Sequence, residues 1–162
     1  MPPPFRAGAS VVTPTLHDWR MHHPWRALRH LETWTLIWSL LPGDTLGITD
    51  WSTHTITLDP RQLQPERRCT IAHEVEHVRR GPLRSHDPVH VAREGSRVHR
   101  TVARQLIHLD RLGDALSWSL DPHEVAEALW VDVDTLRTRI DHLHPSERAH
   151  LRRRTEHHHD HK

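Results

Sequence analysis

The stretch TIAHEVEHVRRGP, residues 70–82, decides how this chain is interpreted, because it contains the pattern His-Glu-x-x-His from His73 to His77. On an α-helix these two histidines lie about 40° apart, so that both imidazoles can reach one cation. Three apolar residues gather on the opposite side of the same helix: Ile71, Val75 and Val78. The stretch therefore predicts a helix with one face for the core and another that presents imidazoles.

The pattern by itself is weak evidence in this chain, because 19 of the 162 residues are histidine. At this composition about 0.1 chance matches are expected, against about 0.004 in a chain of ordinary composition. The flanking residues add specificity, since Pro65 and Glu66 suit the first turn of a helix and Gly81-Pro82 ends one. We therefore expect a helix of about 15 residues to carry the motif.

Composition favours one soluble domain. No apolar run approaches the roughly 18 residues that span a bilayer, and the opening MPPPFRAGAS lacks the apolar region of a secretory signal. The single cysteine, Cys69, excludes an internal disulfide, and together these features predict a cytoplasmic protein. The formal net charge of +1 gives no reason to expect a nucleic-acid or membrane partner.

The remaining patterns predict an α+β fold, in which a small antiparallel sheet of about three strands packs on the motif helix. TWTLIWSLLPGD predicts one strand, and TLGITDWSTHTITLDP predicts two more around a turn near Ser52 and Thr53. A second long helix is expected from Asp87-Pro88 to about Ile107, followed by a helical C-terminal part with shorter helices. The predicted parts are an irregular segment 1–24, a core 25–110, a helix-turn-helix-like part 111–152 and a polar, frayed, His-rich tail 153–162.

Two histidines form an incomplete zinc site, because catalytic zinc takes three protein ligands and keeps an open position for water. The longer motif with glycine at position 80 and histidine at position 83 is excluded, since Arg80 and Leu83 stand there. The remaining common ligand is a carboxylate on the following helix, and Glu94 is the only glutamate between His77 and Glu124.

Glu94 falls at the edge of an apolar stripe on the second long helix, where a carboxylate is costly unless it is paired or binds a metal. We therefore predict a Zn²⁺ site made by His73, His77 and Glu94, with Glu74 as the general base. The alternative for Glu94 is a surface carboxylate that pairs with Arg93 or Arg97. The stripe consists of Val91, Val98, Val102 and Leu106.

These residues resemble the ImmA/IrrE family of metallopeptidases, in particular its short actinobacterial and actinophage members. RRCTIAHEVEHVRRGP is similar to the family's active-site helix, and REGSRVHRTVARQLIHLDRL to the next helix, which carries the glutamate ligand. DPHEVAEALWVDVDTLRTRIDHLHPSER resembles the helical C-terminal part. The resemblance spans about residues 34–151 and implies a zincin-type (gluzincin-like) zinc endopeptidase that cleaves a protein partner, such as the transcriptional repressor of a phage or mobile element.

The chain departs from the family around the third ligand. The family's glutamate commonly stands three residues before a small residue that is followed by asparagine, whereas Glu94 stands four before Val98, which is followed by His99. His99 is therefore the alternative third ligand, or a group that stabilises the oxyanion, since the chain has no tyrosine.

A second interpretation also stays open: a non-catalytic, metal-stabilised regulatory protein that docks a repressor or DNA through its C-terminal helices. VAEALWVDVDTLRTRI has helix-turn-helix spacing, but Trp130 stands where the turn favours glycine. Nearby aspartates offset Arg137 and Arg139, so this segment does not predict a phosphate-binding surface.

Overall fold

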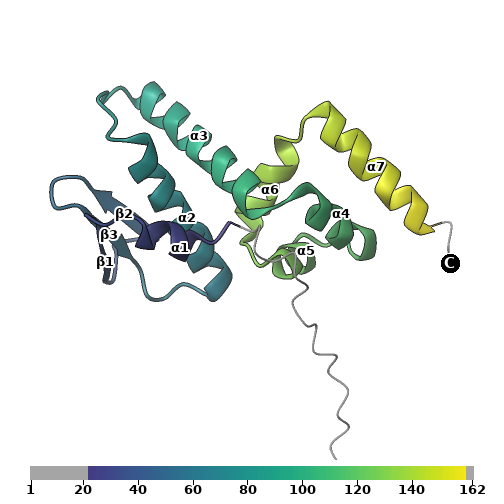
Figure 1. Cartoon of the computed structure of the whole chain (residues 1–162), viewed down its shortest axis with the longest axis horizontal. Coiled ribbons are helices and arrows are strands. Elements are labelled where there is room, and N and C mark those ends of the chain that lie inside the picture. Colours follow the sequence, from purple (N-terminus) through teal and green to yellow (C-terminus); the bar gives the residue numbers. More distant parts are fainter. Residues whose placement is uncertain (1–21, 160–162) are drawn as a thin grey trace, which may run out of the picture.

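The computed structural model describes residues 22–159, which fold into a three-stranded sheet and seven helices (Figure 1). Helix α1 (Pro24–Arg29) precedes the strands β1 (Thr35–Trp38), β2 (Gly47–Asp50) and β3 (Thr55–Leu58), and α2 (Gln64–Arg80) follows them. The C-terminal half contains α3 (Pro88–Leu106), α4 (Leu109–Trp118), α5 (Pro122–Leu129), α6 (Val133–Asp141) and α7 (Pro145–His159). Of the predicted irregular segment 1–24, residues 1–21 lie outside the described part. The α+β class is confirmed.

The sheet is mixed, so the predicted antiparallel sheet is wrong in one of its pairings. Strand β3 lies in the middle, antiparallel to β2 and parallel to β1. Alternation along the chain identified the strands but carries no information on their neighbours. Residues 39–46 are long enough to carry the chain past one strand position, and Asp59 holds this connection by accepting a 2.9 Å hydrogen bond from the Leu41 backbone N–H.

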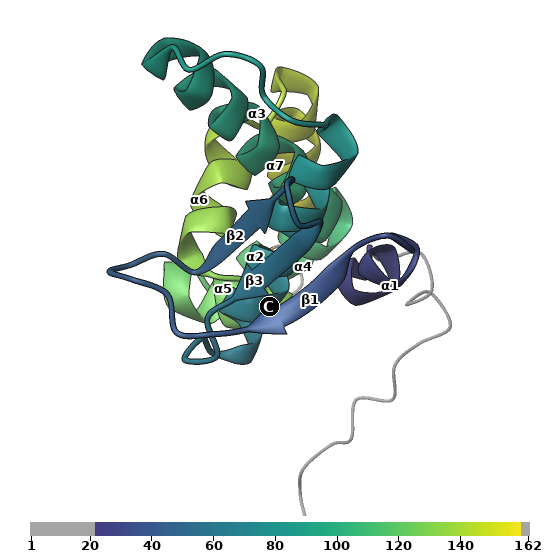
Figure 2. The ribbon, with the colours of Figure 1, turned by 90° about the vertical axis from the view of Figure 1, so that its left-hand side faces the viewer.

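The sheet packs on α2, as Figure 2 shows, and both β2 and β3 contact the helix. Ile56 and Leu58 are fully buried and form one apolar cluster with Ile71 and Val75 of α2. These are the positions that alternation on the strand and helical spacing on α2 predict for the core. The apolar side of α2 is thereby covered, and its histidines are left on another side.

A second apolar cluster joins α3 to the C-terminal helices. Val98, Val102 and Leu106 of α3 are buried in it, as the predicted stripe requires, together with Leu112, Val125 and Leu136 from α4, α5 and α6. Val91 was expected in this stripe but is about half exposed, because the first turns of α3 extend beyond the helices that cover its C-terminal half.

The turn between α5 and α6 places Trp130 in the left-handed region, with φ 56° and ψ 47°. Arg68 of α2 stabilises this conformation, because its guanidinium donates a 2.9 Å hydrogen bond to the Trp130 carbonyl and lies 5.9 Å from the indole centroid. A tryptophan therefore occupies the position where glycine was expected, held by a residue 62 positions away in the chain.

Helix α7 contradicts the predicted frayed tail for residues 153–159, because it continues through His159. Although α7 is polar in composition, one of its sides packs on α4. On this side Leu151 is buried and Arg154 pairs with Asp114 of α4 at 2.6 Å. Gly113 permits this approach, since a Cβ there would lie 2.9 Å from Arg154 Cδ. None of the described helices is both long and apolar enough to span a membrane.

Candidate functional site

The two motif histidines converge on α2. The Nε2 atoms of His73 and His77 lie 3.0 Å apart, and their ring centroids are 4.6 Å apart. Two nitrogens bound to one tetrahedral zinc at about 2.05 Å would lie about 3.3 Å apart, so the observed separation requires an adjustment of only a few tenths of an ångström. The two ring nitrogens are therefore close enough to bind one ion.

Both imidazoles favour the neutral form, which is the form that binds metal. Burial, together with smaller contributions from the neighbouring rings of His77 and His99, lowers the pKa of His73 to about 3. Burial also lowers the pKa of His77, although Glu94 acts in the opposite direction. The nitrogen lone pairs are consequently available at neutral pH.

Both candidates for the third ligand lie near the pair. The ring centroid of His99 on α3 is 4.6 Å from that of His73. The carboxylate of Glu94 accepts hydrogen bonds from Arg80 through both oxygens, and it also lies 3.8 Å from Arg97. The pairing with Arg97 was foreseen as the alternative for Glu94, whereas the pairing with Arg80 was not.

The donor set fits zinc in its two imidazoles and leaves the third position open between Glu94 and His99. Within residues 22–159, no three His, Cys, Asp or Glu side chains are already grouped as a metal site. Coordination by Glu94 would require Arg80 to release it. Coordination by His99 would break none of the ion pairs found among the described residues, and its ring centroid already lies 4.6 Å from that of His73.

Glu74 lies between the helix and the sheet, with 6% of its surface exposed. Burial raises the pKa of its carboxyl to about 7, while a hydrogen bond from Thr49 opposes the shift. Thr49 Oγ1 donates this bond to Oε2 of Glu74 over 2.7 Å. A carboxyl group that titrates near neutral pH can both take up and release a proton, as a general base must.

Strand β2 passes very close to this carboxylate at Gly47. A Cβ on Gly47 would lie 2.8 Å from Glu74 Oε1 and 2.7 Å from Thr70 Cγ2. Neither Gly47 nor Thr49 was identified from the sequence, because only the packing of β2 on α2 brings them to the motif. Alternation places both residues on one face of β2, but the apolar residue between them, Ile48, would assign the other face to the core, whereas Ile48 is exposed.

The site lies at an edge of the sheet. Strand β2 pairs with β3 on one side only, so its other edge has no strand partner among the described residues. An unpaired strand edge offers backbone N–H and C=O groups to an extended peptide. Glu74 and the histidine pair are therefore next to a surface that can hold a peptide by main-chain hydrogen bonds.

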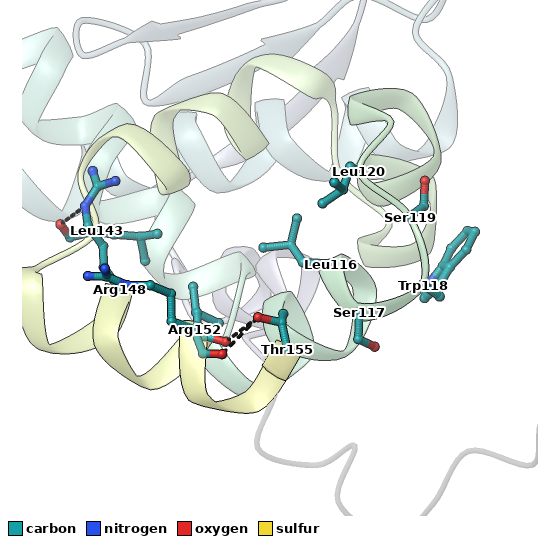
Figure 3. A pocket seen from close by; sticks show the side chains of 10 residues that line it. Leu116, Ser117, Trp118, Ser119, Leu120, Leu143, Arg148, Arg152 and Thr155 are labelled. Atoms are coloured by element: carbon teal, nitrogen blue, oxygen red, sulfur yellow. Dashed lines mark hydrogen bonds between the residues drawn. The ribbon is translucent and has the colours of Figure 1, made fainter. Parts of the chain in front are cut away.

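The surface hollow in Figure 3 lies elsewhere, between α4, the α4–α5 connection and α7. Its volume is about 720 Å³, and its lining is apolar and hydroxylic with two arginines, Arg148 and Arg152. No imidazole or carboxylate lines it, so it offers no acid–base chemistry. The motif residues of α2 contribute nothing to it.

Comparison with known proteins gives no match: no family model fits the chain, and neither a curated protein nor a solved structure is significantly similar to it.

Proposed function

We propose that this protein is a zinc-dependent endopeptidase that hydrolyses a peptide bond in a protein partner. One observation carries the proposal: the buried carboxylate of Glu74 stands on α2 beside two neutral imidazoles whose Nε2 atoms lie 3.0 Å apart. A metal-binding pair and a carboxyl group with a pKa of about 7 are the two components that hydrolysis by this mechanism needs.

The proposed roles follow from the positions of the side chains. His73 and His77 would hold the ion, with Glu94 or His99 as the third ligand. Bound zinc would act as a Lewis acid that polarises the carbonyl of the scissile bond. Glu74 would accept a proton from the attacking water and pass it to the leaving amine. His99, if it is not a ligand, would stabilise the oxyanion.

The unpaired edge of β2 favours a substrate that binds in an extended conformation. A peptide added along this edge would run past Gly47 and Thr49, which contact Glu74. The resemblance to the ImmA/IrrE family suggests a transcriptional repressor of a phage or mobile element as the partner, and a zincin-type packing of α2 on the sheet. A cytoplasmic location is supported by the single cysteine, Cys69, which is free and buried.

Metal content and cleavage together test this function. The protein, shortened to residues 1–156 to remove the tail histidines, should bind one zinc per chain, and His73→Ala should lose it. Glu74→Gln should keep the zinc but abolish cleavage in a peptide library scored by mass spectrometry. Cleavage by Glu74→Gln at the wild-type rate would refute the catalytic role. Zinc that stabilises both forms while neither cleaves would instead support the non-catalytic, metal-stabilised regulatory protein.

A further inference from the structure

Helix α3 carries a straight row of four arginines, Arg93, Arg97, Arg100 and Arg104, which we name the arginine stripe. At about 100° per residue, these positions fall within about 60° of one another around the helix. Arg93 and Arg104 are 11 positions apart, which is about 16 Å along the axis at 1.5 Å per residue. All four side chains are exposed.

The arginine stripe faces away from the protein. The buried residues of α3, Val98 and Val102, lie on the opposite side of the helix. The first turns of α3 also extend beyond the C-terminal helices (Figure 1) and contact the end of α2, through Glu94 and Arg80. The arginine stripe is therefore open along its length to a large partner.

The positive charges of the arginine stripe are largely unneutralised. Arg93 and Arg104 form no ion pair within the described part of the chain, and Arg97 has only a 3.8 Å contact with Glu94, which Arg80 already holds. The Arg100 guanidinium donates to a backbone carbonyl of its own helix.

Arg104 has a weak electrostatic interaction with Glu147 of α7. The carboxylate of Glu147 already forms an ion pair with Arg139 at 2.8 Å. Four cations thus share one side of a helix in a chain whose formal net charge is +1.

The chemistry between the arginines distinguishes two kinds of acidic partner. Ser96 and Thr101 flank the arginine stripe, about 70° to either side of its centre, and the Ser96 hydroxyl donates to the Ala92 carbonyl. The one large apolar residue on the side of the stripe, Val89, lies at the N-terminal end of the helix. Protein interfaces have an apolar or aromatic centre, whereas nucleic-acid interfaces are polar and positively charged. Arginine and hydroxyl donors together are the groups that contact phosphates.

We propose that the arginine stripe binds the phosphate backbone of a nucleic-acid duplex without reading its sequence. Successive arginines rise about 5.5 Å along α3, and phosphates recur every 3.4 Å of axis on each strand, so long side chains can reach neighbouring phosphates. The balanced net charge and the α5–α6 segment gave no reason to expect this partner, because the charge is local to α3. The inference is independent of zinc and of catalysis.

The test measures binding of a fluorescein-labelled 20-base-pair duplex by anisotropy at pH 8. Four phosphate contacts predict that log K falls with log salt with a slope of about −3.6. Arg97→Gln/Arg100→Gln should reduce the slope by about 2 and weaken binding about tenfold or more at low salt. The matched control is Arg137→Gln/Arg152→Gln, which removes the same charge from exposed positions on α6 and α7 and should change neither strongly.

Three results would overturn the proposal: no binding at 50 mM salt, equal losses in the control variant, or strong preference for one duplex sequence. Displacement by polyglutamate at lower charge concentration than by unlabelled duplex would also overturn it, and would assign the surface to an acidic protein. Unchanged circular dichroism of both variants confirms that folding is not the cause, as expected for exposed helix positions.

Discussion

Thr49 Oγ1 donates a 2.7 Å hydrogen bond to Oε2 of Glu74, although the two residues are 25 positions apart and belong to β2 and α2. Glu74 is almost inaccessible to water, so this hydroxyl replaces solvent as a partner of the carboxylate. The bond connects the edge strand to the helix that carries the histidines. The position of the candidate base therefore depends on the sheet as well as on the motif.

Replacing Thr49 tests that dependence. Thr49→Val keeps the shape of the side chain but leaves a buried carboxylate without its hydroxyl donor, which should lower the free energy of unfolding by about 1.5–3 kcal/mol at pH 8. Thr49→Ser retains the donor and should lose much less. Urea unfolding of the two variants measures the difference. If valine and serine were equally tolerated, the hydrogen bond would have no energetic role.

Gly47 provides a steric counterpart. In Gly47→Ala the new methyl group meets Thr70 Cγ2 and Glu74 Oε1 below 3 Å, so β2 or Glu74 must move. We expect a loss of about 1–3 kcal/mol in unfolding free energy, as for other overpacked sites. Gly95→Ala is the matched control, because a Cβ there meets nothing within 4 Å and alanine favours the helix. Similar stability of the two variants in thermal unfolding would contradict the close approach.

Local patterns were sufficient for the helices α2 and α3 and for the hairpin of β2 and β3, because spacing and turn residues act within a few positions. They were insufficient for the pairing of β1 and for α7. The neighbour of β1 is decided by the path of residues 39–46, and α7 is held by contacts to α4 from residues about 40 positions away. Such contacts leave no periodic signal in the segment itself.

The candidate site divides in the same way. The i, i+4 spacing is sufficient to bring His73 and His77 together, and His99 does lie beside His73. For Glu94, helical spacing gave the side of α3 but not the partner. The guanidinium of Arg80 comes from the preceding helix, and only the packing of α2 on α3 brings it to Glu94.

The raised pKa of Glu74 predicts a pH dependence of stability in the metal-free protein. The folded pKa of about 7 lies above the ordinary value of 4.5 for a glutamate. The stabilisation by the protonated carboxyl is therefore fully present below pH 4.5 and is lost as the pH rises through 7. The loss should level at about 3 kcal/mol, given 1.36 kcal/mol per unit. The glutamine of Glu74→Gln does not ionise. The free energy of unfolding of this variant should therefore rise relative to that of the wild type between pH 4.5 and 7.

Urea unfolding in a chelator across pH 4.5–8.5 measures this gain. The difference between Glu74→Gln and the wild type should be constant above about pH 8, because the carboxyl is then ionised in both folded and unfolded states. A difference that did not change with pH would mean that Glu74 ionises at an ordinary pKa in the folded protein.

Arg80→Ala distinguishes the two candidates for the third zinc ligand. The guanidinium of Arg80 forms an ion pair with the Glu94 carboxylate. A partly exposed pair of this kind contributes about 0.2–1 kcal/mol. If Glu94 is the ligand, its release should tighten zinc binding by up to about fivefold, as measured by competition with a chelating dye. If His99 is the ligand, Arg80→Ala should leave the affinity unchanged while His99→Ala weakens it. Arg79→Ala removes the same charge from the neighbouring position and is the control, because Arg79 does not pair with Glu94.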